Sequence, residues 1–402
     1  MDHDIEWLFD EVYKIKRKNS RDIHFISDWD VKGDNPSEFS DLLHHVYNDS
    51  SKSSLKYNYA YEQFSLKNQI LEAANTDRGL NLEETEITIT PSATISIYLC
   101  AQALASLDVK RILIITPAYF STHESFDKAG CHVFYYHLKD DNNLELDTRE
   151  IEAIVRQQYI QGIVVTDPVY SGGIEFTLEV YRELSVLCNE NDIYFIVDYS
   201  LGGLNWNEEK MFVLNTNKLK ILKETKKFLF LDTLTKRLLM NGIKFSAIIG
   251  DEDIIDKIDR ISEIVYGGLS AAQCFLINKL YLKQNRELIV SICRKNIEAT
   301  KESYRQVNSL LVGTDFELTR TNSGYFSLIN HKKFKLEDID TKRFSLDLLE
   351  KYGILAICKD RFTYFQENNF GFRINLNKKK DTLLPYIHQC IQIDLRKYNH
   401  VR

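Results

Sequence analysis

Lys236 lies between two apolar, strand-like runs of the sequence, where a positive charge would be costly to bury. Residues 227–231, KFLFL, lead into Thr233, Thr235 and Lys236, and a second apolar run covers residues 244–250. Burial and neighbouring cations lower the pKa of an amine, so that it is neutral more of the time. A neutral lysine amine can attack an aldehyde and form a Schiff base. Lys236 is therefore the first candidate for a catalytic group.

Polar and aromatic side chains also follow four other apolar runs. Ser92, Ala93 and Thr94 follow the run at 86–90, and Tyr119 follows the run at 111–116. Tyr170 follows the run at 162–166, and Asp198 follows the run at 193–197. Open α/β sheets bind ligands at the edge where the carboxyl ends of their strands meet. We therefore expect these groups to lie close to Lys236.

Together the groups suit one cofactor, pyridoxal 5′-phosphate (PLP). The backbone N–H groups and hydroxyls of residues 92–94, where a helix follows a strand, suit a phosphate. Two hydroxyls and a cation add to that site: Thr233, Thr235 and Lys244. Tyr119 offers a flat face to a ring, and Asp198 offers a carboxylate to a pyridinium nitrogen. With the amine of Lys236, these are the groups that hold PLP in proteins.

The sequence resembles the fold-type I PLP enzymes of the class I/II aminotransferase family, from about Tyr57 to Leu376. The family pattern is Ser-x-Ser-Lys, with Gly, Arg and Gly at plus six, eight and ten, and here those places hold Thr233, Thr235, Lys236, Gly242, Lys244 and Ser246. Shorter family motifs are similar to Ser92-Ala93-Thr94, Pro117-Ala118-Tyr119, residues 167–173, residues 198–201 and Phe372-Arg373-Ile374. Six such matches occur in the family's order.

The resemblance implies a role for each matched residue. Lys236 would hold PLP as a Schiff base and shuttle a proton, and Asp198 would face the ring nitrogen. Tyr119 would stack on the ring, with Phe120 as the alternative. Arg373 would bind the substrate carboxylate, since its guanidinium suits bidentate pairing. In a homodimer, Tyr59 would reach the phosphate of the neighbouring subunit, and Tyr57 and Tyr61 compete for that place.

Three of the departures from the family pattern concern groups that would contact the cofactor. Lys244 replaces an arginine, which keeps the charge but loses the bidentate fork. Tyr170 and Leu201 replace the asparagine and the tyrosine that contact the ring 3′-oxygen. We hypothesise that the Tyr170 hydroxyl takes over that contact. These changes argue against plain transamination of a common amino acid and favour a specialised branch of metabolism.

Strand-like and helix-like segments alternate over most of the chain. The alternation predicts an α/β fold with a mostly parallel seven-stranded sheet flanked by helices, plus a smaller α+β C-terminal domain. We expect residues 1–50 to form an N-terminal arm belonging to the small domain, 51–280 the large PLP-binding domain, and 281–402 a long linking helix and the small domain. The helical pattern that leads into the linking helix starts near residue 270.

Composition excludes several other classes of protein. The formal net charge of −7 argues against a nucleic-acid partner. No apolar run approaches a membrane span, and the acidic N-terminus does not read as a secretory signal. The seven cysteines form no CxxC pair, which favours reduced thiols in a cytoplasmic protein over a disulfide frame or a metal site.

The sequence therefore predicts a PLP-dependent aminotransferase that acts on an amino acid or a related small amine-bearing acid. An alternative is other PLP chemistry on the same fold: elimination, decarboxylation, or an oxidase or cyclase step, because the same Lys–Asp pair serves all of them. A non-catalytic binding protein is a third reading. Regulators that resemble this family carry a DNA-binding domain at the N-terminus. No helix-turn-helix with a basic face is evident before Tyr57, which argues against this third reading.

Overall fold

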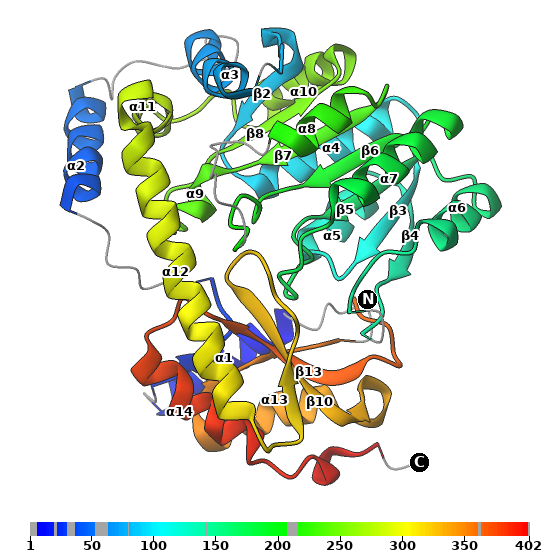
Figure 1. Cartoon of the computed structure of the whole chain (residues 1–402), viewed down its shortest axis with the longest axis vertical. Coiled ribbons are helices and arrows are strands. Elements are labelled where there is room, and N and C mark those ends of the chain that lie inside the picture. The colour runs from blue at the N-terminus through cyan, green and yellow to red at the C-terminus, as the bar shows by residue number, and fades with distance from the viewer. Residues whose placement is uncertain are drawn as a thin grey trace.

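The computed structural model contains two main β-sheets with their covering helices, one larger and one smaller, and a short two-stranded sheet (Figure 1). It describes residues 6–19, 22–29, 37–52, 63–78, 80–140, 143–206, 216–360 and 363–400. The larger sheet lies at the top of Figure 1 and the smaller one at the bottom.

The larger sheet has seven strands, in the order β2-β8-β7-β6-β5-β3-β4. They are β2 (Ile87–Thr90), β3 (Arg111–Thr116), β4 (His132–His137), β5 (Gly162–Thr166), β6 (Tyr194–Asp198), β7 (Phe228–Asp232) and β8 (Ser246–Gly250). Only β8 runs antiparallel to its neighbours in this sheet. The β2 and β5–β8 strands are buried along their whole length, as expected of a sheet covered on both faces. The predicted mostly parallel seven-stranded sheet is confirmed.

Helices cover both faces of this sheet, because alternate strand residues point to opposite sides. One apolar core contains Ile112 and Ile114 of β3, and another contains Leu113 and Ile115. The first is covered by α4 (Ala93–Ser106), α5 (Phe120–Lys128) and α10 (Glu252–Val265), and the second by α6 (Thr148–Gln157), α7 (Leu178–Asn191) and α8 (Thr216–Lys223). The short helix α9 (Leu234–Arg237) follows β7 directly.

The smaller sheet is antiparallel, in the order β12-β13-β10-β9, and has its own apolar core. Its strands are β9 (Phe316–Leu318), β10 (Phe326–Lys335), β12 (Ile357–Cys358) and β13 (Asn369–Asn375). Around this sheet lie α1 (Glu6–Asn19), α13 (Thr341–Asp347) and α14 (Lys380–Ile391), and α12 (Arg286–Leu311) runs between the two sheets (Figure 1). The expected second α+β unit is present. The domain boundaries at residues 50 and 280 remain predictions.

The N-terminal segment joins the C-terminal part of the chain. Strand β1 (His24–Phe25) pairs in parallel with β11 (Ile354–Leu355). Farther along, α2 (Ser37–Lys52) and α3 (Phe64–Arg78) both pack against α11 (Ala271–Tyr281). The remaining short helices are η2 (Glu84–Glu86), η3 (Lys283–Asn285), η4 (Leu336–Asp338), η5 (Leu348–Tyr352) and η6 (Leu395–Tyr398).

The helical pattern that begins near residue 270 forms two helices instead of one. Helix α11 ends at Tyr281, and Leu282 adopts an extended backbone with ψ 131°. The Asn285 side-chain amide donates to the Lys279 carbonyl at 2.7 Å, which satisfies a C-terminal carbonyl of α11. The linking helix α12 therefore begins at Arg286. Among the described residues, no helix has the length and apolarity needed to cross a bilayer.

Candidate active site

A cavity of about 170 Å³ lies at one edge of the seven-stranded sheet. Ten predicted site residues line it: Ser92, Ala93, Thr94, Tyr119, Tyr170, Asp198, Thr233, Thr235, Lys236 and Lys244. Leu201 lines it too, as do seven residues that the sequence did not single out: Trp29, Ile97, Ser121, Thr166, Ser200, Asn241 and Phe245. The structure thus brings together residues that lie as far apart in the sequence as Trp29 and Phe245.

Strand direction explains why these groups meet. Strands β2, β3, β5, β6 and β7 run parallel, so the residues after them share one edge of the sheet. Strand β8 lies between β2 and β7 and runs the other way, so it starts at that same edge. Lys244 and Phe245 therefore enter the cavity from the beginning of a strand.

Lys236 lies on α9, just after β7. Its Nζ donates to Asn241 Oδ1 at 2.7 Å and lies 4.2 Å from the centroid of the Trp29 ring. Burial lowers the pKa of this amine to about 8, with repulsion from Lys244 acting in the same direction and Asp198 opposing it. A large fraction of the amine is therefore neutral near pH 8, as a nucleophilic lysine requires.

We predict that Lys244→Met raises the pKa of Lys236, because it removes a cation that opposes protonation. The rate at which acetic anhydride modifies Lys236 in the cofactor-free protein should then fall at pH 7–8, since less amine is neutral. Peptide mass spectrometry across a pH series measures that rate. Lys244→Arg keeps the charge and should retain the wild-type profile. An unchanged profile in Lys244→Met would contradict the assigned cause.

Asp198 ends β6 and is 9% exposed. The Ser200 N–H donates to Asp198 Oδ1 at 3.0 Å, and the Ser200 hydroxyl donates to the same oxygen. Burial raises the pKa of this carboxyl, while the Ser200 hydrogen bonds and then Lys236 lower it. Both hydrogen bonds use Oδ1, so Oδ2 keeps its capacity to accept a proton donor.

The residues around the start of α4 offer the groups that an anion site requires. Ser92 caps this helix by accepting from the Ile95 N–H at 3.2 Å. A helix N-terminus carries a partial positive charge and favours a bound anion. Thr233, which follows β7 and caps α9, donates its hydroxyl to the Phe245 carbonyl at 2.6 Å, and this hydroxyl lies 2.8 Å from the Thr235 hydroxyl.

Two buried hydroxyls of the cavity indicate that it is built for a polar ligand. Ser121 Oγ and Thr166 Oγ1 have no hydrogen-bond partner among the described residues. Buried polar atoms are normally hydrogen-bonded, so these two oxygens suit a bound molecule. With the amine, the carboxylate and the anion site in the same cavity, the residues present fit PLP.

Arg373 lies behind the cavity wall and is 2% exposed. Its Nε and Nη2 donate to the Ser27 carbonyl at 3.1 and 2.6 Å, and its Nη1 donates to the Tyr170 hydroxyl. The guanidinium also lies 4.4 Å from the centroid of the Phe326 ring. The structure therefore places Arg373 against Tyr170, a cavity residue, and not in the cavity lining itself.

Trp29 is the main cavity residue that the sequence did not reveal. Its ring lies near both Lys236 Nζ and, at 5.8 Å, the Arg373 guanidinium carbon, and it meets Tyr119 edge to face with centroids 5.8 Å apart. The Trp29 carbonyl accepts from Asn241 Nδ2 at 2.6 Å. Because all these partners are distant in sequence, no local pattern marks this residue.

The aromatic alternatives have different outcomes. Tyr119 lines the cavity, whereas Phe120 begins α5. Tyr59, Tyr57 and Tyr61 lie outside the described residues, so the expected contact with a neighbouring subunit remains a prediction.

Comparisons with known proteins agree with this site. The model of the family "Aminotransferase class I and II" matches residues 41–388. An aspartate aminotransferase from Sulfolobus acidocaldarius is 20% identical over 311 residues, which cover 76% of this chain and 74% of the relative.

Solved structures with a similar fold include a double mutant of Thermus thermophilus aspartate aminotransferase, with TM-score 0.82 and 15% identity over 97% of each chain. YbdL from Escherichia coli, which has a methionine aminotransferase function, has TM-score 0.76 and 16% identity over 96% of each chain. These likenesses confirm the fold. Because the family match spans most of the sequence, this chain belongs to the class I and II aminotransferase family, whose members are PLP-dependent transferases.

Proposed function

We propose that this chain binds PLP and transfers the amino group of an amino acid, or of a related small amine-bearing acid, to an acceptor keto acid. One observation carries the proposal: a buried lysine amine with pKa lowered to about 8 shares a cavity with a buried carboxylate and a helix N-terminus. The relatives act on aspartate or methionine by their names, which supports an amino acid as the substrate.

Each residue would have a defined task. Lys236 would hold the cofactor through its amine and then move a proton to and from the substrate's α-carbon as general base and acid. Asp198, held by Ser200, would keep a proton on the ring nitrogen. The phosphate would lie against the anion site, which consists of Ser92, Ala93, Thr94, Thr233, Thr235 and Lys244, and Tyr119 would stack on the ring. PLP, when bound, supplies an electron sink for the carbanion at that carbon.

Arg373 and Tyr170 would serve the substrate end of the site. A guanidinium has five N–H donors, and the described contacts of Arg373 use three of them. One N–H on each Nη therefore remains for a carboxylate. The Tyr170 hydroxyl accepts from Arg373, so its own proton can be donated to the cofactor's 3′-oxygen, as hypothesised from the sequence.

We further propose a cytoplasmic homodimer in which Tyr59 of each protomer reaches the partner's cofactor phosphate. All seven cysteines are free thiols, which supports a reducing compartment.

The purified protein tests the proposal directly. It should be yellow or take up added PLP, and borohydride should fix the cofactor to Lys236, as located by peptide mass spectrometry. With ¹⁵N-labelled amino acids and a keto acid, the label should appear in the amino acid formed from the acceptor. A colourless protein that takes up no PLP overturns the proposal. Release of ammonia or carbon dioxide without transfer would favour the alternative PLP chemistries.

A further inference from the structure

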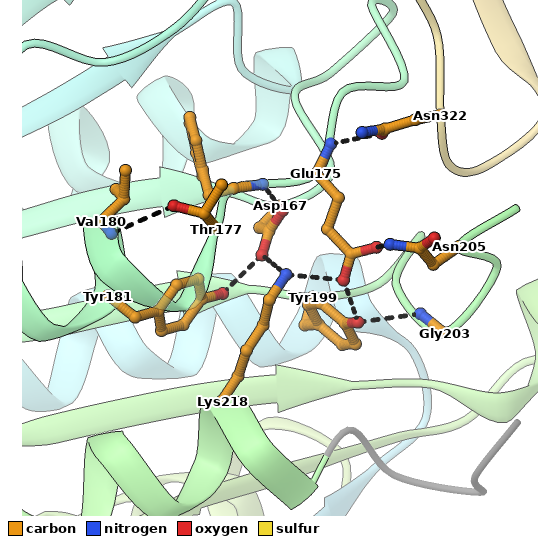
Figure 2. Close-up of polar contacts among 11 residues, drawn as sticks. Asp167, Glu175, Thr177, Val180, Tyr181, Tyr199, Gly203, Asn205, Lys218 and Asn322 are labelled. Atoms are coloured by element: carbon orange, nitrogen blue, oxygen red, sulfur yellow. Dashed lines mark hydrogen bonds and ion pairs between the residues drawn. The ribbon is translucent and has the colours of Figure 1, made fainter. Parts of the chain in front are cut away.

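A buried ionic cluster adjoins the cavity, and Figure 2 shows the polar contacts of this cluster. Two strand ends supply residues to both places. Thr166 and Asp198 line the cavity, and the residues that follow them, Asp167 and Tyr199, point into the cluster. This alternation is expected where successive residues of extended chain face opposite sides.

Lys218 of α8 is the centre of the cluster (Figure 2). Its side chain is 4% exposed, and its Nζ donates to Asp167 Oδ2 at 2.5 Å and to Glu175 Oε1 at 2.6 Å. The same Nζ lies 5.0 Å from the ring centroids of both Tyr181 and Tyr199. One cation thus joins two carboxylates that are eight positions apart in the sequence.

Both carboxylates receive further hydrogen bonds. Asp167 accepts from the Tyr181 hydroxyl at 2.6 Å and from the Phe176 N–H at 3.0 Å. Glu175 accepts from the Tyr199 hydroxyl and from Asn205 Nδ2, both at 2.7 Å. The cluster is therefore fully bonded, which gives its members fixed positions.

The cluster holds the two backbone loops that carry cavity side chains. Asp167 and Glu175 bracket the loop that contains Tyr170, and Lys218 links both ends of that loop. The Asp167 N–H donates to the Asp198 carbonyl at 2.9 Å. On the second loop, the Tyr199 hydroxyl accepts from the Gly203 N–H at 3.1 Å while donating to Glu175.

Stability alone does not explain such a cluster. Removing charges from water costs much of what their pairing returns, so apolar packing could fill the same volume about as well. The pKa of Asp167 is raised, because burial of its carboxylate outweighs the favourable interaction with the Lys218 ammonium, which lowers the pKa. What an ionic cluster adds is a single geometry for the chain segments that it joins.

We propose that Lys218 is a positioning residue for the active site, which fixes the loops that carry Tyr170 and Asp198 and so places both side chains toward the cofactor. The inference rests on the proposed PLP function for its catalytic consequence. Its structural part concerns the cofactor-free chain and can be tested separately.

Three variants and a matched control test the proposal. Lys218→Met removes the cation, and Lys218→Arg keeps it. Lys218→Met leaves two buried carboxylates unpaired, so Tyr199→Phe provides a milder break in the same cluster. The control is Lys359→Met, since Lys359 is also a fully buried lysine, paired with Asp140 at 2.7 Å, but lies outside the cavity lining.

The first measurement is hydrogen exchange in the cofactor-free protein. Lys218→Met and Tyr199→Phe should speed exchange in residues 167–175 and 199–205, and Lys218→Arg should restore much of the protection. Lys359→Met should lower thermal stability without affecting these two segments preferentially. Because no cofactor is present, this result does not depend on the proposed function.

The second measurement is steady-state transamination by the PLP-loaded variants. Misplacement of Asp198 should lower kcat about 10- to 100-fold in Lys218→Met, and misplacement of Tyr170 beside Arg373 should raise KM, with partial recovery of both in Lys218→Arg. The proposal is overturned if the folded cluster variants match the wild-type protein both in the hydrogen-exchange rates of the two loops and in kcat. It is also overturned if Lys218→Met shows only the global destabilisation of Lys359→Met. Where Lys218→Met does not fold, Tyr199→Phe and Lys218→Arg decide.

Discussion

Lys236→Met is expected to lower the rate of amino transfer by at least about 10⁴-fold, because one change removes both the covalent attachment and the proton shuttle. After borohydride treatment in the presence of PLP, the variant protein should also carry no cofactor covalently attached at position 236. Transfer of ¹⁵N between amino acid and keto acid measures the rate. Lys333→Met, which removes a lysine whose side chain is 69% exposed, should behave as wild type. Turnover by Lys236→Met at near wild-type rate would refute the assigned role.

The same substitution should stabilise the cofactor-free protein at neutral pH. The Lys236 pKa is about 8 in the folded chain against an ordinary value of 10.5, so the unfolded chain binds more protons between these two values. The free energy of unfolding contributed by Lys236 therefore rises with pH across that window. At pH 7 the folded wild-type protein bears the full free-energy cost of burying the protonated Lys236 amine, up to roughly 3 kcal/mol, and Lys236→Met removes this cost. Urea unfolding of both proteins at pH 7 and pH 10 measures the difference, which should shrink at the higher pH.

Asp198→Asn is expected to lower kcat by about 10²- to 10³-fold, because a neutral amide cannot hold a proton on the ring nitrogen as a carboxylate does. PLP uptake should survive, since Lys236 and the anion site at α4 are unchanged. Visible absorbance titration measures uptake, and the ¹⁵N assay measures kcat.

Asp251→Asn is the matched control for Asp198→Asn. Asp251 also follows a strand, β8, but that strand is antiparallel and ends at the opposite edge of the sheet. It caps α10 by accepting from the Ile254 N–H at 3.2 Å. Because asparagine caps a helix about as well as aspartate does, the control should keep both its stability and its kcat. Equal kcat values for the two variants would remove Asp198 from the mechanism.

The sequence predicted the seven strands of the large sheet and the edge at which their polar residues gather. It could do so because each strand is a short apolar run, and because a polar or aromatic group follows five of the runs. The prediction that Lys236 holds the cofactor came from the spacing of Thr233, Thr235 and Lys244 around it, which resembles the family pattern. The antiparallel direction of β8 was not specified, since an apolar run looks the same in either direction.

Features that depend on distant contacts could not be predicted. Trp29 reaches the cavity through pairing of β1 with β11, which joins residues 330 positions apart. Lys218 lies in a short helix with three lysines, and nothing in that pattern separates the buried Lys218 from the more accessible Lys220 and Lys223. The break between α11 and α12 depends on one asparagine side chain and an extended Leu282.

The pairing of β1 with β11 also orders the events of biosynthesis. The predicted amine, ring and phosphate residues lie between positions 92 and 244, so a nascent chain can assemble them once the large sheet is complete. Arg373 gains its hydrogen bonds to the Ser27 carbonyl only after a segment that is synthesised later has returned to one that is synthesised much earlier. We expect the cofactor half of the site to mature on the ribosome ahead of the half that receives the carboxylate.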